Sequence, residues 1–409
     1  MYHPDVVDRR LHQLQKTLPV KLKRYEVGDS LDRQEALATV WDPKELKSTR
    51  PLTRDEQEFC FNEILLSTYD FRYWANRYAF LNSPTGELKR LEFWESQEVA
   101  FGHIAQGELD AWKNGSDNLW DWLKARQLGA TQVSASLMSH RLFFHCNQRG
   151  IEASDEPSHS LELSRRVELI FNNLPWWMKP RRKFHVKGAE MYFDILNCAL
   201  VIGHGRKEGG GLGQGQTTNI FHFTELPDWE NFGMIEEDFL PTVPIHPTSV
   251  GLMESTARGK HDQWHIHFKL AWSGKSRFKA FFIPYYAEER RYSITPPSGW
   301  KPTKLTELHA TQVEQDSPKY MRGRTVRLTP GQMYFWEFTR TEYEKKGKLP
   351  IFLQEYASNH LEAFQNINIG MFDDNLILEM RNKLKPFIAY DLVVHNDHVK
   401  PTYGGAMVM

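Results

Sequence analysis

The chain has 409 residues, of which 40% are apolar and 25% charged, and its formal net charge is −1. A chain well above about 250 residues exceeds what one compact core usually holds, so we expect two domains or one large domain with an appendage. The balanced charge argues against a tight, permanent nucleic-acid binder, because proteins that neutralise many phosphates usually carry a basic surplus. A protein that binds and releases nucleic acid transiently needs only a local basic patch, so the balanced charge does not exclude one.

Several classes of protein are excluded by the cysteines and by the apolar runs. Cys60, Cys146 and Cys198 are widely spaced and form no CxxC, which excludes a disulfide framework or zinc site and is typical of a reducing cytoplasm. The first nine residues are charged and no apolar run follows them, so we expect no signal peptide. No run of about 18 apolar residues occurs, so we expect no membrane span.

The first 54 residues are mostly polar and predict an arm or adaptor segment, with a helical pattern at 6–18 and a Pro- and Gly-containing stretch at 19–31. A solvated leader is the alternative. From 55 to 80, apolar and aromatic residues recur at intervals of three and four, which predicts an amphipathic helix or a helix pair.

Between residues 90 and 272, short apolar runs alternate with helical patterns. The runs at 199–202, 220–223 and 250–253 are typical of buried strands, and 161–172 is typical of a helix. This alternation predicts the α/β class, with a mostly parallel sheet between helices and the chemistry at the strand ends. We expect this core to cover residues 55–285.

After Trp272 the pattern changes. Residues 278–284 predict one more strand, 285–319 are expected to be rich in loops, and helical patterns follow at 329–345 and 375–384. We therefore expect a smaller lid or linker subdomain over residues 286–409.

A candidate phosphate-binding loop, KARQLGAT, covers residues 124–131. It follows an aromatic-rich apolar run and precedes a helical pattern. It offers Gly129 for close backbone approach and Thr131 as a hydroxyl for Mg²⁺. Considered alone, the loop is better explained as a surface turn with two basic residues.

The usual lysine of such a loop is missing, since Ala130 precedes the hydroxyl. One cation at about 4 Å from a phosphate is worth about 4 kcal/mol at an effective dielectric of about 20, so a working site needs one. Lys124 and Arg126 are the candidates within the loop.

Two strand ends carry further polar groups. In NIFHFTEL a strand ends at Thr224 and Glu225; Glu225 would orient and deprotonate an attacking water, whereas Thr224 can hydrogen-bond a Mg²⁺-bound water but brings no charge. In VGLMESTARG a strand leads into Ser255 and Thr256, hydroxyls that could sense a γ-phosphate. Gln97, before the first core helix, could read the adenine edge with its amide. Each is also compatible with an ordinary strand-end, turn or cap residue.

In this order and spacing the motifs resemble the large terminase subunit of tailed bacteriophages, the motor that packages viral DNA. The family's Gln motif, its Arg-Gln-x-Gly-x-Ser/Thr loop, its Ser/Thr-Glu strand end and its Ser-Thr-Ala coupling segment have counterparts in Gln97, 126–131, 224–225 and 255–257. The resemblance runs from about residue 55 to 384.

The resemblance implies a RecA-like (ASCE) P-loop ATPase core followed by a small lid or linker, with ATP and Mg²⁺ as cofactors. The implied residues are, for ATP binding, Gln97, Lys124, Ala125, Arg126, Gln127, Leu128, Gly129, Ala130 and Thr131; for the metal, Thr131 and Thr224; for catalysis, Glu225, Arg126 and Lys124; and for coupling, Ser255, Thr256 and Ala257.

The implied partners are double-stranded DNA, the portal protein of the procapsid, a small terminase subunit and further copies of the chain in a ring, in the host cytoplasm at the portal and with no membrane. Family members continue into an RNase H-type nuclease domain. Residues after 384 contain no acidic constellation for two metals, so we expect that domain to be absent and this chain not to cleave DNA.

The arginine finger of terminase rings is expected about eleven residues before the catalytic Glu, and Gln214 occupies that position. Arg206 or Lys207, in the same Gly-rich segment at 203–216, or Arg165 could act in trans instead. Incidental charges of a loop are the alternative for each. The histidines at 261, 265 and 267 are interpreted as packed or solvated rather than as a metal site.

Two rival functions stay open. A superfamily 2 helicase would separate strands without a capsid, although the chain lacks a DEAD/DEAH-type box. A nucleotide-binding assembly protein that does not hydrolyse ATP is compatible with Ala130 and Thr224.

Overall fold

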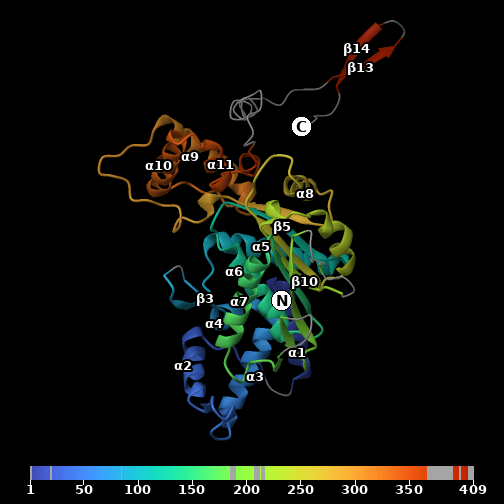
Figure 1. The fold of residues 1–409 in the computed structure, drawn as a ribbon, viewed down its shortest axis with the longest axis vertical. Coiled ribbons are helices and arrows are strands. Elements are labelled where there is room, and N and C mark those ends of the chain that lie inside the picture. Colours follow the sequence, from blue (N-terminus) through green and yellow to red (C-terminus); the bar gives the residue numbers. More distant parts are fainter. Residues whose placement is uncertain are drawn as a thin grey trace. The chain divides into compact units, whose positions relative to one another are not determined.

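The fold is described by a computed structural model that covers residues 2–18, 21–83, 85–184, 190–206, 212, 217–365, 390–395 and 398–403 (Figure 1). Met1–Phe364 form one compact unit and Gln365–Met409 a second. In the second unit, β13 (Tyr390–His395) and β14 (His398–Tyr403) form an antiparallel hairpin.

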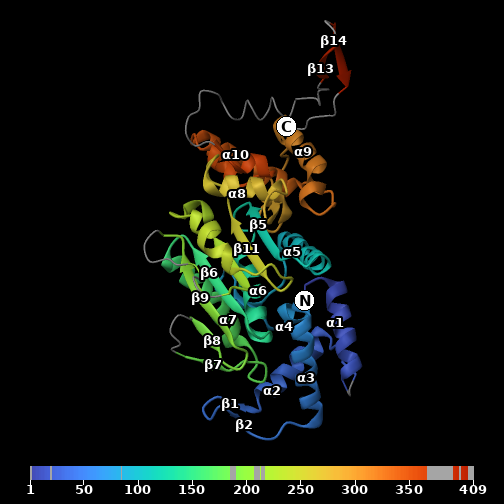
Figure 2. The ribbon, with the colours of Figure 1, turned by 90° about the vertical axis from the view of Figure 1, so that its right-hand side faces the viewer.

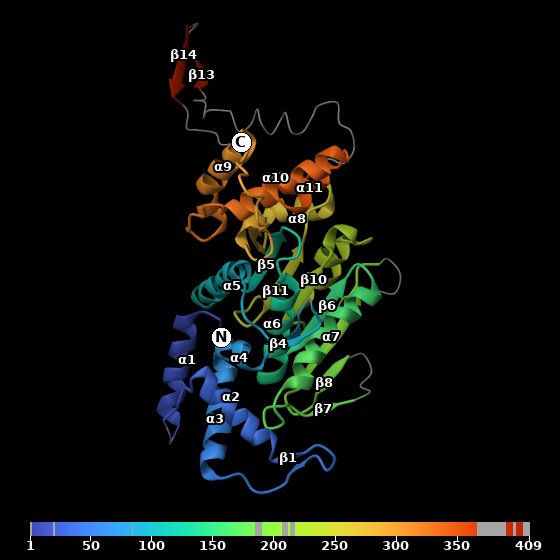
Figure 3. The ribbon, with the colours of Figure 1, turned by 90° about the vertical axis from the view of Figure 1, so that its left-hand side faces the viewer.

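The first unit is built on an eight-stranded sheet in the order β12-β5-β11-β10-β6-β9-β8-β7. The strands are β5 (Asn118–Lys124), β6 (Arg149–Ser154), β7 (Arg182–Lys183), β8 (Met191–Phe193), β9 (Cys198–His204), β10 (Ile220–Thr224), β11 (Val250–Ser255) and β12 (Lys279–Ile283). The six strands from β12 to β9 are parallel, whereas β8 pairs antiparallel with β9, and β7 pairs antiparallel with β8. The predicted α/β class with a mostly parallel sheet is confirmed, and β11 separates β5 from β10 (Figure 3).

Helices pack on both faces of this sheet. One face is in contact with α5 (Glu95–Asn114), α6 (Ala130–Phe144) and α7 (Pro157–Asn173), and we call it the α6 face. The other is in contact with α8 (Gln263–Trp272) and the short helices η1 (Leu226–Asp228), η2 (Ile235–Phe239) and η3 (Leu240–Thr242). Because successive strand residues point to opposite faces, Trp120 and Trp122 of β5 enter the first core and Leu119 and Leu123 the second.

The amino-terminal region contains α1 (Pro4–Thr17), α2 (Val27–Ala38), the hairpin of β1 (Trp41–Asp42) and β2 (Lys47–Ser48), α3 (Arg54–Tyr69), α4 (Phe71–Tyr78) and the hairpin of β3 (Phe80–Asn82) and β4 (Leu88–Arg90). The predicted helix pair over 55–80 is confirmed as α3 and α4. Tyr2 is buried and its backbone amide donates to Glu108 Oε2 at 2.6 Å, so this part of the chain is packed and the solvated-leader alternative is wrong.

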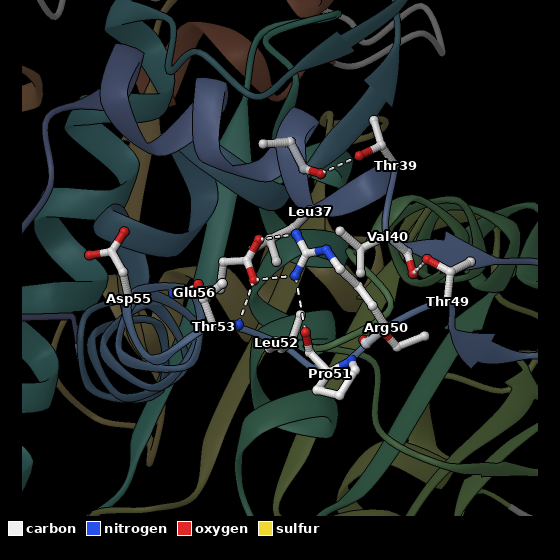
Figure 4. Close-up of polar contacts among 12 residues, drawn as sticks. Leu37, Thr39, Val40, Thr49, Arg50, Pro51, Leu52, Thr53, Asp55 and Glu56 are labelled. Carbon is white, nitrogen blue, oxygen red and sulfur yellow. Dashed lines mark hydrogen bonds and ion pairs between the residues drawn. The ribbon is translucent and has the colours of Figure 1, made fainter.

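The start of α3 is set by a capping box (Figure 4). The Thr53 hydroxyl accepts from the amide of Glu56 at 3.3 Å, and Glu56 in turn accepts from the amide of Thr53 at 2.7 Å. Arg50 holds both carboxylate oxygens of Glu56 at 2.7 and 2.8 Å, so the β1–β2 hairpin is tied to the helix that follows it (Figure 4).

After the sheet, the chain forms η4 (Tyr285–Ala287), α9 (Lys304–Tyr320), α10 (Pro330–Lys345), α11 (Leu349–Glu355) and α12 (His360–Ala363). Helices α9–α11 and the pair α2–α3 lie at opposite ends of the first unit (Figure 1, Figure 2). The helix predicted at 329–345 is confirmed. None of the helices that the structure describes combines the length and apolar character that a membrane span requires.

One expectation for this region is wrong, because α9 occupies much of the stretch expected to be loop-rich at 285–319. Thr303 caps the helix, and its buried positions are Thr306, Val313, Ser317 and Tyr320. Their spacing is helical, but two of the four are small and polar, which hides the apolar period. The helix expected at 375–384 lies outside the described residues.

The close contact between β10 and β11 allows a test of the core. Gly251 lies opposite Phe221, and a Cβ at Gly251 would meet the Phe221 ring at 2.1 Å. We expect Gly251→Ala to lower the free energy of unfolding by about 1–3 kcal/mol, because overpacking forces the ring to move. Urea denaturation measures this.

The matched control is Gly28→Ala on α2, where nothing lies within 4 Å of the added Cβ. Alanine is the better helix former, so this variant should be as stable as the wild type or more so. Equal losses in both variants would contradict the packing described for Gly251.

Candidate nucleotide-binding site

The candidate phosphate loop connects β5 to α6 at the carboxyl edge of the parallel strands. Gly129 is the N-cap of α6 with φ +71°, a left-handed conformation that favours glycine, and a Cβ there would meet Gln97 Nε2 at 2.3 Å. The first amides of a helix have no acceptor within the helix and point toward its open end, where an anion can bind. The start of α6 is therefore open to an anion, and phosphate binding by this loop stays a prediction.

A buried carboxylate, that of Glu254 on β11, lies beside this loop. Lys124 Nζ is 3.1 Å from Glu254 Oε2. The hydroxyls of Thr131 and Thr224 each donate to Glu254 Oε1 at 2.9 Å. The structure thus brings together three of the predicted residues, from β5, α6 and β10, around a fourth residue that the sequence analysis did not single out.

Glu254 belongs to a row of charged side chains on the α6 face of the sheet. Glu152 on β6, His222 on β10, Glu254 on β11 and Lys124 on β5 all point to this face, and we call them the polar row. His222 lies between two carboxylates, with Nδ1 3.5 Å from Glu152 and Nε2 3.4 Å from Glu254. A signal existed in the sequence, since a Glu and a His within buried apolar strands need partners.

The polar row separates the pKa values of two neighbouring carboxylates. Burial tends to raise the pKa of Glu254, but Lys124, His222 and the Thr131 hydroxyl outweigh it and lower the pKa to about 2. Burial and the nearby Glu254 raise the pKa of Glu225. Glu254 is therefore a permanent anion and Glu225 the better proton acceptor, a division typical of sites with separate electrostatic and base roles.

Glu225 directly follows β10 and has φ +53°, a left-handed conformation that is uncommon for a residue with a side chain. The preceding Thr224 carbonyl accepts a hydrogen bond from Trp229 Nε1 at 2.9 Å, which fixes the turn. The strand end that the sequence predicted is thus a constrained turn with a half-buried carboxylate.

Arg126 points away from the polar row. Its guanidinium is 3.0 Å from Glu355 Oε2 of α11, its backbone amide donates to the Glu355 carbonyl at 2.9 Å, and its carbonyl accepts from the Tyr292 hydroxyl. The side chain is 60% exposed, against 11% for Lys124. Arg126 therefore ties the loop to the helices after the sheet.

Gln97 contacts the loop from α5. Its Oε1 accepts from the Trp94 amide at 2.9 Å and its Nε2 donates to the Gly129 carbonyl at 3.1 Å. The side chain is buried, with both ends of its amide engaged within the chain. Reading of adenine by Gln97 stays a prediction, and it requires that these two bonds be exchanged.

The proposed coupling residues follow Glu254 along the chain. Ser255 is buried at the end of β11, and its hydroxyl has no hydrogen-bond partner among the described residues. Thr256 is half-buried and Ala257 buried. A buried hydroxyl without a partner is costly and often marks a functional position.

Among the candidates for a trans-acting cation, Arg206 follows β9 and its Nη2 lies 2.6 Å from Glu156 Oε1, with the side chain 45% exposed. Arg165 is exposed beside Glu162 on α7. Gln214 and Lys207 lie outside the described residues.

The face opposite the polar row has a buried pair of its own. His267 Nε2 on α8 is 3.3 Å from Asp121 Oδ2 on β5, and its Nδ1 is 3.3 Å from Glu236. His265 is held at the start of α8, where its amide donates to Asp262 Oδ1 at 2.7 Å. Within the described part of the chain, no group of three or more His, Cys, Asp and Glu has the arrangement of a metal site.

Comparisons with known proteins find similarity to solved structures alone. No protein-family model matches this sequence, and no curated protein matches it. Similar solved structures include the HK97 bacteriophage large terminase, at 14% identity and a TM-score of 0.44, with 76% of this chain and 57% of that chain covered.

Two other similar structures are also phage terminases. The large terminase of a thermophilic bacteriophage in complex with ATP-gamma-S has 12% identity and a TM-score of 0.33, with 53% of this chain and 49% of that chain covered. The ATPase domain of the Thermus phage P74-26 large terminase has 13% identity and a TM-score of 0.32, with 47% of this chain and 88% of that domain covered. The chain spans about half the length of the HK97 terminase and of the terminase solved with ATP-gamma-S.

The buried ion pair of Lys124 and Glu254 predicts that loss of either residue alone destabilises the fold. We expect Lys124→Met to lower the free energy of unfolding by about 3 kcal/mol at pH 7 without nucleotide, because it leaves a buried carboxylate without its main counter-charge. In the wild type, the lowered pKa of Glu254 adds to the free energy of unfolding at pH values above the ordinary pKa of 4.5. This stabilisation is lost as the pH falls toward the folded-state pKa of about 2.

The double variant Lys124→Met/Glu254→Gln should recover more than half of that loss, since no unpaired charge remains. Urea unfolding of both variants, arranged as a double-mutant cycle, measures the coupling. A double variant no more stable than Lys124→Met would contradict the ion pair.

Proposed function

We propose that the chain is an ATP-hydrolysing motor domain that moves double-stranded DNA, with the role of a terminase large subunit in packaging a viral genome. The single observation that carries the proposal is the meeting of Lys124, Thr131 and Thr224 at the carboxyl edge of the sheet, beside a glycine-capped helix start and a strand-end Glu225. A phosphate loop, a hydroxyl for the metal and a base are what phosphoryl transfer from ATP requires.

In this proposal the amides of residues 127–131 and the ammonium group of Lys124 hold the phosphates, and Thr131 and Thr224 face the metal. Magnesium, when bound with ATP, neutralises charge on the transferred phosphoryl group. Thr131 and Thr224 fit such a role, because both hydroxyls already converge on one buried carboxylate oxygen. Glu225 orients and deprotonates the attacking water, for which a pKa above the usual range is suited.

Lys124 is the stronger candidate for the phosphate-binding cation. Lys124 and Thr131 contact the same carboxylate, that of Glu254, so both lie on one side of the loop. Arg126 instead pairs with Glu355 on α11, at the other side of the loop. We propose that Arg126 transmits the state of the loop to the helices after the sheet, in addition to any contact it makes with phosphate.

Residues 55–285 are proposed to be the ATPase core and 286–409 the lid or linker, with 1–54 as an adaptor. Ser255, Thr256 and Ala257 would relay the loss of the γ-phosphate, since the buried Ser255 hydroxyl has no hydrogen-bond partner among the described residues and could take one. Gln97 would contact adenine after release from Gly129.

The packaging role rests on the resemblance of the motifs to terminases. The resemblance implies as partners double-stranded DNA, a portal protein on the procapsid, a small terminase subunit and neighbouring copies in a ring. It also implies that the motor works in the host cytoplasm. Arg206 would reach a neighbour's nucleotide in such a ring, because it is an exposed cation after a strand end.

The second candidate is a nucleotide-binding assembly protein without turnover. The observation that favours it is the neutral Thr224 at the strand end, together with a Lys124 already neutralised by Glu254. A helicase is the third, and it requires unwinding of duplex DNA.

Turnover distinguishes these functions. We expect the wild type to hydrolyse ATP in the presence of Mg²⁺ and duplex DNA, and Glu225→Gln to lose at least about 100-fold in rate while still binding ATP, because it removes only the base. The exposed Glu237 gives the matched control Glu237→Gln, expected to keep the wild-type rate.

A wild type that binds ATP but never hydrolyses it, even at concentrations that favour ring assembly, would favour the assembly protein. Strand separation in the same assay would favour the helicase. Steady-state phosphate release and a gel-based unwinding assay measure the two outcomes.

The choice of cation has its own test. We expect Lys124→Ala to weaken ATP binding by about tenfold or more. A partly buried contact between one charge and a phosphate is worth more than about 1.4 kcal/mol, which corresponds to a factor of about ten in affinity. Arg126→Ala should weaken it less, because its guanidinium faces Glu355. Fluorescent-nucleotide titration measures both, and wild-type affinity in both variants would contradict the loop assignment.

A further inference from the structure

The strand end of the proposed ATPase lacks an acidic side chain at the position before Glu225. Thr224 occupies it, and a hydroxyl brings no charge to a metal. We propose that Glu254, on the neighbouring strand β11, is the carboxylate that faces the magnesium of the bound nucleotide in place of an acid at Thr224. This inference rests on the proposed ATPase function and adds a residue to it.

The first argument is the register of the two strands. Thr224 pairs directly with Glu254 in the parallel ladder of β10 and β11. Paired residues point to the same face, and neighbouring strands lie about 4.8 Å apart. A carboxylate on β11 therefore reaches the same space as a side chain at the end of β10, and here the Thr224 hydroxyl donates to Glu254 Oε1 at 2.9 Å.

The second argument is that Thr131 contacts the same oxygen. Its hydroxyl donates to Glu254 Oε1 at 2.9 Å, so one carboxylate oxygen joins the loop residue and the strand-end residue. These three oxygen groups come from α6, β10 and β11. Mg²⁺ prefers oxygen donors and takes only one or two carboxylates from the protein beside phosphates and water, so this donor set fits it.

The third argument is the charge balance of a fully buried carboxylate. Without nucleotide, Lys124 provides the counter-charge at 3.1 Å. If Lys124 turns to the phosphates, Glu254 would be left beside the γ-phosphate, with His222 as the remaining basic partner among the described residues, and an unpaired buried charge is costly. Magnesium arriving with the nucleotide supplies the replacement, so that one cation is exchanged for another beside Glu254.

A purely structural role for Glu254, as the buried partner of Lys124, is the alternative. The two roles differ in one measurable property. A structural carboxylate affects stability but leaves the effect of Mg²⁺ on nucleotide binding unchanged, whereas a metal-facing carboxylate controls that effect.

The test measures ADP affinity by titration in Mg²⁺ and again in EDTA, so it does not depend on turnover. Wild type should bind ADP more tightly with Mg²⁺. Glu254→Gln, which keeps the size of the side chain, should reduce this Mg²⁺ enhancement about tenfold or more, because a full charge facing a divalent cation is removed. In EDTA its affinity for ADP should equal or exceed that of the wild type, since Lys124 is released from its partner.

Relocation of the charge provides a rescue. The double variant Glu254→Gln/Thr224→Asp restores a carboxylate on β10 and should regain most of the Mg²⁺ enhancement. The matched control is Glu152→Gln, which removes a buried charge from the far end of the polar row, beside His222, and should keep the wild-type enhancement. Glu254→Asp keeps the charge for Lys124 but draws it back by one methylene, and it should show an intermediate loss if Glu254→Gln does not fold.

The outcomes separate the inference from the function on which it rests. An undiminished Mg²⁺ enhancement in Glu254→Gln, or in Glu254→Asp where only that variant folds, overturns the assignment of Glu254 while the ATPase proposal stands. A wild type that binds no adenine nucleotide overturns the proposed function and the inference together. Loss in Glu254→Gln with recovery in the double variant supports both.

Discussion

One fully buried carboxylate organises the candidate site. Glu254 accepts hydrogen bonds from Thr131 and Thr224 through one oxygen and pairs with Lys124 through the other. An ion in this position is stable only if its partners are fixed, because each lost contact leaves charge in a medium of low polarity. The loop after β5, the start of α6 and the end of β10 are therefore held in register by the same side chain.

The parallel sheet makes this arrangement possible. With β11 between β5 and β10, the side chains that end these three strands lie at one edge, and helix α6 starts directly above them. The loop itself is anchored from both sides, by Gln97 through Gly129 and by Arg126 through Glu355. The contact with Glu355 and the bond from the Tyr292 hydroxyl to the Arg126 carbonyl join this candidate loop to the part of the chain after the sheet.

The sequence predicted the elements that have a clear period and missed what depends on pairing between strands. Buried strands at 220–223 and 250–253 were recognised from apolar runs, and the loop from one glycine and one hydroxyl. Glu254 lies directly after one of those runs, but its partners come from 30 and 123 residues away, and only the strand order brings them together. Helix α9 was missed for a local reason, since its buried face contains Thr306 and Ser317 among the apolar residues.

The polar row also shows why Ala130 and Thr224 cannot be judged one at a time from the sequence. Ala130 and Thr224 each look like the loss of a charge when compared with an ordinary phosphate loop and an ordinary acidic strand end. In three dimensions a cation and a carboxylate lie nearby on neighbouring strands, because Lys124 Nζ is 3.1 Å from Glu254 Oε2. Because the two are paired with each other and Glu254 is fully buried, displacement of one requires a new partner for the other. In the proposed site, this pairing would couple the binding of phosphate to the binding of metal through electrostatics.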